Sequence, residues 1–305
     1  MAVTRRERRG DVVSATDPFV GRDSELEKIA TSLLRPARLV TLIGPGGVGK
    51  TRLATEAVRR FSMSTRRPVY WVRLARLAKG ADIAAVEDEV TGAVVDADSS
   101  EPSTWDALVD TLTSTDALGR NLQTVLVMDN CEHVLAAAGQ LIAELTEAVP
   151  GLTILATSRR PIGWVDEFIV LVPPLSQRQA LTLFRHRAEL TGNAVTTAGQ
   201  IEQAKLICRH VHNNPLYIRL AAARLLRQPM AAIVADLEGG PQTNGCAGPG
   251  GPGWEPNYAT RAFLMSSPGP MTCARTRNDC FWIECRSSPR AMTPTLRTTP
   301  ARHRI

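Results

Sequence analysis

Short apolar runs alternate with longer amphipathic segments from residue 17 to about residue 175. The apolar runs have the length of strands and cover residues 39–43, 68–74, 124–129, 152–157 and 168–172. The amphipathic segments have the apolar spacing of a helix face and cover residues 23–29, 51–61, 81–95, 105–118 and 134–149. Strands that alternate with helices predict an α/β domain with a doubly wound, mostly parallel sheet.

The strand pattern stops after Pro174, and only helical spacing continues. It covers residues 177–190, 199–211, 216–226 and 230–237. We therefore predict a sheet domain over residues 17–175, followed by a small all-helical module over residues 176–239.

Both ends of the chain lack this patterning. Residues 1–16 are predicted to be a disordered basic arm, and residues 240–305 are predicted to be disordered because they keep neither hydrophobic period. This tail is explained equally well by an out-of-frame translation, which cuts a longer protein short near residue 240, and by a genuine flexible extension.

The net charge of +6 does not describe the predicted folded part. Residues 1–10 carry +3 and residues 240–305 carry +5, which leaves −2 for residues 11–239. A basic surface is the usual sign of nucleic-acid binding. The charge distribution therefore gives no support for nucleic-acid binding by the core.

The cellular compartment and the state of the cysteines are predicted from three features that the sequence lacks. No apolar run has the length of a membrane span, and no apolar region follows the arginines of residues 1–10 as in a secretory signal. We expect a cytoplasmic protein. The six cysteines lack C-x-x-C spacing, so we expect free thiols and no zinc site.

Residues 44–51 read GPGGVGKT and directly follow the first predicted strand. They fit the phosphate-binding loop G-x-x-x-x-G-K-[ST], whose glycines let backbone N–H groups reach phosphate oxygens. The helix that follows directs its positive dipole end at the same anion. We assign nucleotide contacts to Gly44, Gly46, Gly47, Val48, Gly49, Lys50, Thr51 and Arg52. The simpler alternative is a glycine-rich turn with a chance lysine, but the order of strand, loop and helix argues against it.

Three positions are assigned to the terminal phosphates and the metal ion. Lys50 is expected to reach the β- and γ-phosphates, and Thr51 and Asp129 are expected to hold Mg²⁺. Asp129 ends the apolar run at residues 124–129, which is where a doubly wound sheet binds its ligand. An ordinary aspartate in a turn after the strand is the alternative.

The residues after Asp129 predict slow hydrolysis. Asn130 occupies a position at which many ATPases carry a second acid, and an amide cannot act as a general base. Glu132 is the candidate to replace that acid through a water molecule. Arg159 follows the next predicted strand and is expected to contact the γ-phosphate, unless it is a surface arginine.

Together these residues resemble the STAND class of P-loop NTPases. The closest likeness is to the ATPase module of large LuxR-family and AfsR-like bacterial transcriptional regulators, which are relatives of the NB-ARC proteins. The resemblance covers about residues 17–239. Besides the phosphate loop it is carried by FVGR at 19–22, VMDNCEH at 127–133, ATSR at 156–159, VPPLS at 172–176, NPL at 214–216 and LAAAR at 220–224.

The resemblance implies roles for residues outside the loop. Val20 and Arg22 would lie near the adenine and ribose, Pro215 would cover the base, and Arg159 would sense the γ-phosphate. It also implies that ADP holds the sheet domain and the helical module closed. An inducer would exchange ADP for ATP, and the opened form would oligomerise or free an output domain.

The chain also departs from this family. The Gly-Leu-Pro-Leu stretch of the family is NNPL here, and no winged helix or LuxR-type helix-turn-helix follows Leu237. The leading hypothesis is an ATP/ADP-binding, Mg²⁺-dependent regulatory switch with weak ATPase activity. It would bind adenine nucleotide, associate with itself or related regulators, and reach DNA only through output domains that this chain lacks. A truncated, non-catalytic nucleotide-binding remnant and direct DNA binding by the basic flanks are the alternatives.

Overall fold

A five-stranded sheet organises the first part of the chain. The computed structural model describes residues 19–34, 37–65, 67–95, 104–113 and 123–239, and the predicted basic arm, the 96–102 loop and the tail lie outside them. The strands are β1 (Leu39–Ile43), β2 (Val69–Arg73), β3 (Thr124–Asp129), β4 (Leu152–Ser158) and β5 (Glu167–Leu171). Their order is β2-β3-β4-β1-β5, and every neighbouring pair is parallel.

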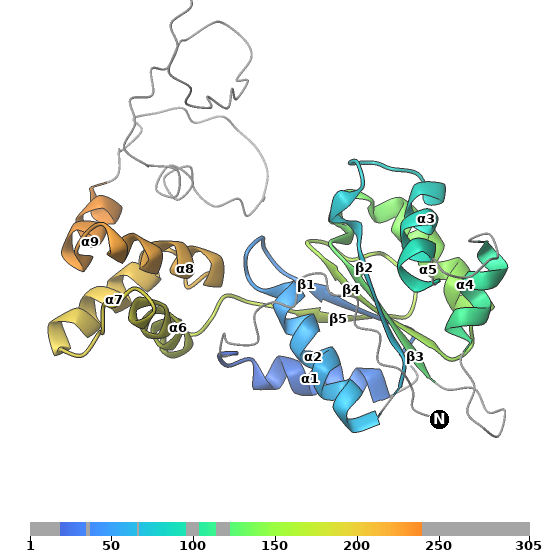
Figure 1. Ribbon diagram of the computed structural model, residues 1–305, viewed down its shortest axis with the longest axis horizontal. Coiled ribbons are helices and arrows are strands. Elements are labelled where there is room, and N and C mark those ends of the chain that lie inside the picture. The colour runs from blue at the N-terminus through green and yellow to red at the C-terminus, as the bar shows by residue number, and fades with distance from the viewer. Residues whose placement is uncertain (1–18, 35–36, 66, 96–103, 114–122, 240–305) are drawn as a thin grey trace, which may run out of the picture. The chain divides into compact units, whose positions relative to one another are not determined.

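Helices cover both faces of this sheet (Figure 1). Helices α1 (Asp23–Leu34) and α2 (Lys50–Thr65) pack on one face, and α3 (Ile83–Val94), α4 (Trp105–Leu112) and α5 (Leu135–Ala148) pack on the other. Successive side chains of a strand point to opposite faces, and accordingly Leu39 and Val40 of β1 belong to different hydrophobic clusters. The prediction of a doubly wound parallel sheet is confirmed.

The burial of the strands follows their place in the sheet. Every residue of the inner strand β3 is buried, which explains the almost wholly apolar run that ends in Asp129. The edge strand β5 exposes Phe168, Ile169 and Leu171. The helix predicted over residues 105–118 ends at Leu112, and residues 114–122 lie outside the described part of the chain.

A second group of helices has a hydrophobic core of its own. It contains α6 (Gln177–Glu189), α7 (Ala198–His210), α8 (Pro215–Ala223) and α9 (Met230–Glu238), and Phe184, Ile207 and Ile218 are fully buried within it. The helix predicted over residues 216–226 is α8 followed by a 3₁₀ turn at Arg224–Leu226. Capping boxes at the start of α6 and α7, and the Asn214 cap with Pro215 at the first turn, mark where these helices begin.

The chain divides into two compact units, Met1–Ser266 and Ser267–Ile305, and every described residue belongs to the first. The boundary near residue 175, inside that unit, stays a prediction. Within the described residues, no helix combines the length and the apolar character needed to cross a membrane.

We expect Thr197→Ala to lower the free energy of unfolding by about 1 kcal/mol, because α7 loses its N-cap. The Thr197 hydroxyl accepts from Gln200 N, and the Gln200 side chain accepts from Thr197 N. Urea unfolding followed by circular dichroism measures the change. Thr182→Ala is the matched control, because that exposed hydroxyl only bonds the Arg178 carbonyl within α6. Equal stability of Thr197→Ala and the wild type would contradict the assignment.

Candidate functional site

The loop at residues 44–51 joins β1 to α2 at the carboxyl edge of the sheet, where the predicted site residues gather. Gly47 and Gly49 have φ angles of +76° and +97°, which side chains rarely allow. Helix α2 begins at Lys50, so its first N–H groups lie at the end of the loop. The sequence therefore places glycine where the backbone of the loop requires it.

Three carbonyl oxygens of this loop accept hydrogen bonds from residues outside the loop. Those of Gly46, Gly47 and Val48 accept from Asn214 Nδ2 at 3.0 Å, Leu216 N at 3.2 Å and Arg22 Nη2 at 2.8 Å. The carbonyl of Gly49 accepts from Leu53 N within α2 at 2.9 Å. In a trans peptide the N–H points opposite to the C=O, so the following amides turn away from these partners. That arrangement suits a bound anion.

Lys50 folds back over the loop. Its Nζ donates to the carbonyl of Gly44 at 2.8 Å and to that of Pro45 at 3.3 Å. Burial lowers the pKa of Lys50, Glu132 raises it and Arg159 lowers it. The ammonium group therefore lies beside the loop and within the field of both residues.

Thr51 and Asp129 are in direct contact. Thr51 Oγ1 donates to Asp129 Oδ1 at 2.7 Å, and Thr157 Oγ1 donates to the same oxygen at 2.6 Å. Asp129 is only 8% exposed. A hydroxyl and a carboxylate are oxygen ligands of the kind Mg²⁺ takes alongside phosphate and water, so Thr51 and Asp129 fit that ion. Among the described residues, no group of three or more His, Cys, Asp or Glu side chains could hold a metal.

Sequence reasoning assigned no site role to Thr157. It lies at the end of β4, the strand beside β3, and besides donating to Asp129 it accepts from the backbone N–H of Asn130 at 2.9 Å. It thus fixes the Asp129 carboxylate and the turn that follows it. Its place at the carboxyl end of a strand next to the one that carries Asp129 was the signal available in the sequence.

Arg159 and Glu132 form an ion pair beside the loop. Arg159 Nε donates to Glu132 Oε1 at 3.2 Å, and the two side chains are 62% and 18% exposed. Arg159 Nη2 lies 3.3 Å from where a Cβ on Gly46 would stand, so the guanidinium approaches the loop. Glu132 Oε2 is buried, with no hydrogen-bond partner among the described residues. The cation predicted to contact the γ-phosphate is thus held by the carboxylate predicted to assist hydrolysis.

Asn130 is held by His133, to which sequence reasoning assigned no site role. Asn130 has a left-handed backbone (φ +70°), and its Nδ2 lies 3.2 Å from His133 Nδ1. His133 Nε2 lies 2.9 Å from the carbonyl of Leu74. A carbonyl only accepts, so His133 carries its proton on Nε2 and its Nδ1 accepts from the amide of Asn130. His133 therefore sets the orientation of Asn130.

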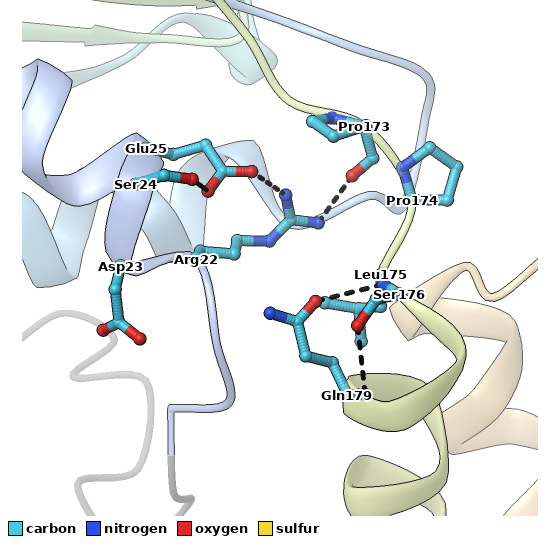
Figure 2. A pocket seen from close by; sticks show the side chains of 9 residues that line it. All are labelled: Arg22, Asp23, Ser24, Glu25, Pro173, Pro174, Leu175, Ser176 and Gln179. Carbon is cyan, nitrogen blue, oxygen red and sulfur yellow. Dashed lines mark hydrogen bonds and ion pairs between the residues drawn. The ribbon is translucent and has the colours of Figure 1, made fainter.

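Arg22 connects three segments of the chain. It is 6% exposed, has φ +66°, and its Nη2 donates to the carbonyls of Val48 and Pro173. Figure 2 shows its guanidinium between Glu25 and Pro173. Burial lowers the pKa of Arg22, and Glu25 raises it. The side chain is thus committed to the loop and to the segment that leads into α6.

A cavity of about 470 Å³ lies beside Arg22 and is lined by residues 22–25, 173–176 and Gln179. Its lining does not include Val20, Pro215 or the loop at residues 44–51. We therefore derive the phosphate position from the loop and not from this cavity. Half-buried Val20 precedes Gly21, where an added Cβ would stand 2.2 Å from Gln179 Nε2, so this segment packs against α6.

The two remaining predicted site residues are Pro215, which belongs to the helical group, and Arg52 on α2. Pro215 is the first residue of α8, between the two residues that bond the loop. Arg52 is half-buried on α2, and burial lowers its pKa, as does the charge of Arg219 on α8. Both positions therefore lie where α8 meets the loop and α2.

The sheet region is similar to a known family of domains. Residues 18–155 match the family model of the AAA ATPase domain. A Mycobacterium tuberculosis protein named "Putative HTH-type transcriptional regulator" is 39% identical over 209 residues, 68% of this chain and 22% of that protein. Another, named "Uncharacterized protein", is 34% identical over 233 residues, 72% of this chain and 53% of that protein. The chain thus spans about a fifth of the length of the first relative and about half of the length of the second.

Two solved structures align with most of this chain. Drosophila ORC bound to DNA aligns with a TM-score of 0.50 at 13% identity, over 70% of each chain. A STAND protein with a tetratricopeptide repeat sensor from Pyrococcus horikoshii aligns with a TM-score of 0.46 at 15% identity, over 72% of this chain and 32% of that chain. The sheet, the loop and the family match together establish a P-loop NTPase-like fold.

We expect Thr157→Val to lower the free energy of unfolding by about 1–3 kcal/mol, because the buried Asp129 carboxylate and the Asn130 N–H each lose a partner. Chemical denaturation measures the loss. Thr41→Val is the matched control: Thr41 is buried in β1, and its Oγ1 has no partner among the described residues. That change should be neutral or stabilising. A neutral Thr157→Val would exclude this role for Thr157.

Proposed function

We propose that this chain binds ATP and ADP with Mg²⁺ and acts as the nucleotide-dependent switch of a regulator. The observation that carries the proposal is the loop at residues 44–51, whose carbonyls are held by the protein, with Thr51 in contact with Asp129 at its end. Anions bind to backbone amides arranged in this way. A triphosphate with its metal ion has the charge and the oxygen ligands that such a loop takes.

Each residue then has a defined task. The loop amides hold the phosphates, and Lys50 leaves the carbonyls of Gly44 and Pro45 to contact the β- and γ-phosphates. Thr51 and Asp129 supply oxygen ligands, and Thr157 keeps the Asp129 carboxylate in place. Bound Mg²⁺ would neutralise part of the phosphate charge. Lys50 and Arg159 supply the remaining positive charge at this edge of the sheet.

Hydrolysis is proposed to be slow. Asn130 cannot take a proton from water, and His133 holds its amide in one orientation. Glu132 is the carboxylate proposed to serve as a base in its place, and one of its oxygens is engaged by Arg159. A phosphate-binding loop without a freely available general base beside it suits a switch, because the bound nucleotide would be converted slowly. The same observation favours a purely non-catalytic nucleotide-binding protein as the second candidate.

Arg159 is proposed to distinguish ATP from ADP. Its exposed guanidinium pairs with Glu132 and approaches Gly46. A γ-phosphate offers a second anionic partner at this position. Arg159 would then leave Glu132 when ATP binds and return to it when ADP is bound. Slow hydrolysis of the bound ATP then rests on Asn130, because Glu132 is no longer engaged by Arg159 in that state.

The remaining assignments concern the base and the larger protein. Val20, Arg22 and Pro215 are proposed to surround the adenine and ribose, and residues 17–175 and 176–239 are proposed as separate sheet and helical domains. The relative named as an HTH-type regulator supports a role in transcription. Within a STAND-type regulator resembling the LuxR and AfsR families, DNA contacts would come from other domains, and the nucleotide would control self-association.

Lys50→Ala is expected to raise the dissociation constants for Mg·ATP and Mg·ADP at least about 30-fold, the cost of removing one partner from a desolvated charge pair. Isothermal titration calorimetry measures both constants. Lys28→Ala, an exposed lysine on α1, is the matched control and should bind like the wild type. Equal affinities of Lys50→Ala and the wild type would refute nucleotide binding through this loop. Turnover of the wild type no faster than that of Lys50→Ala would favour the non-catalytic candidate.

Arg159→Ala is expected to reduce the preference for a non-hydrolysable ATP analogue over ADP by about threefold to tenfold, as for loss of one hydrogen bond at a partly exposed site. Affinity for ADP should change little. Arg160→Ala is the control, because Arg160 is the adjacent exposed arginine. A reduced preference in both variants, or in neither, would remove Arg159 from γ-phosphate recognition.

A further inference from the structure

The helical module bonds to the phosphate loop through one buried side chain. Asn214 is 6% exposed, and its Nδ2 donates to the carbonyl of Gly46 at 3.0 Å, across 168 positions of sequence. Its Oδ1 accepts from Leu216 N at 3.0 Å and so caps α8. Leu216 N also lies 3.2 Å from the carbonyl of Gly47. Both ends of the Asn214 amide are therefore in use.

The approach of α8 to the loop leaves no room for a side chain on Gly47. An added Cβ there would stand 2.8 Å from Leu216 Cβ and 3.0 Å from Asn214 Oδ1. The first turn of α8 thus contacts the backbone of the loop. Of the residues that cap helices well, only asparagine places an acceptor for the cap and a separate amide donor on one short side chain.

We propose that Asn214 is the positioning residue that couples phosphate binding to docking of the helical module; this rests on the proposed nucleotide binding. The carbonyl of Gly46 and the N–H of Gly47 belong to one rigid peptide plane. When Asn214 holds the carbonyl, the direction of that N–H is fixed. A phosphate that binds the N–H in turn fixes the carbonyl where Asn214 can reach it. Each event therefore favours the other, by the same factor.

A simple capping role for Asn214 predicts something different. Loss of a cap weakens α8 and the module, whatever happens at the loop. Loss of the bond to Gly46 acts on the nucleotide through the loop peptide. Asn214→Ser separates the two roles, because serine is a good N-cap and its shorter side chain has no amide donor that can reach Gly46.

The experiment measures binding of a fluorescent ADP analogue with Mg²⁺ to the full chain. Asn214→Ser should raise the dissociation constant about threefold to tenfold, as for one lost hydrogen bond, mainly through faster dissociation. ADP should protect the backbone amides of residues 216–218 from hydrogen exchange in the wild type, and this protection should fall in the variant. Thr197→Ala, which uncaps α7 away from the loop, should leave the dissociation constant unchanged.

Three outcomes would overturn the proposal. Wild-type affinity and protection in Asn214→Ser, in a chain that needs Lys50 for binding, would refute the coupling and leave the proposed function intact. Weaker binding in Thr197→Ala, as in Asn214→Ser, would make the effect one of module stability. No binding to the wild type would remove the proposed function and the coupling together. If Asn214→Ser does not fold, Asn214→Asp is used instead, because it keeps the cap and loses the amide donor. Its dissociation constant and amide protection are compared with those of the wild type and Thr197→Ala in the same way.

Discussion

The direction of the peptide groups between Gly46 and Gly49 is the constraint on which the rest of this structure depends. A loop of small residues has little intrinsic preference for one arrangement. Here three carbonyls are held from outside the loop, by Asn214, Leu216 and Arg22. These partners come from the segment before α1 and from the start of α8, so residues far apart in sequence give one loop its shape. The sheet supplies the platform, and the surrounding segments supply the orientation.

Charged side chains at the carboxyl edge of the sheet lie in pairs of opposite sign. Lys50 and Arg159 lie near the two carboxylates of Asp129 and Glu132. Asp129 is buried and satisfied by two threonine hydroxyls, whereas Glu132 keeps one buried oxygen without a hydrogen-bond partner among the described residues. A carboxylate with one oxygen that accepts from two hydroxyls suits a fixed ligand. A carboxylate that shares an exposed arginine suits an exchange of partners, which is the basis of the proposed discrimination between ATP and ADP.

Rigidity of the peptide plane gives a physical route between the site and the helical module. The route is short, because Asn214 bonds the carbonyl of the peptide group whose N–H is proposed to bind phosphate. Arg22 donates to the carbonyl of Val48 in the loop. It also donates to the carbonyl of Pro173, at the start of the segment that leads into α6. Asn214 thus connects the loop to α8, and Arg22 connects the loop to the segment just before α6.

The sequence by itself determined the elements and the loop. The bounds of β1 and β3 agree with the apolar runs, because buried parallel strands admit few polar residues. The phosphate loop was recognisable because its glycine spacing reflects local backbone geometry. Only the tertiary structure decided which residues support the predicted site residues. Thr157 donates to Asp129, His133 lies against the amide of Asn130, Glu132 pairs with Arg159, and Asn214 donates to Gly46. These contacts join residues through strand order and helix docking, and single polar side chains leave no periodic trace in a sequence.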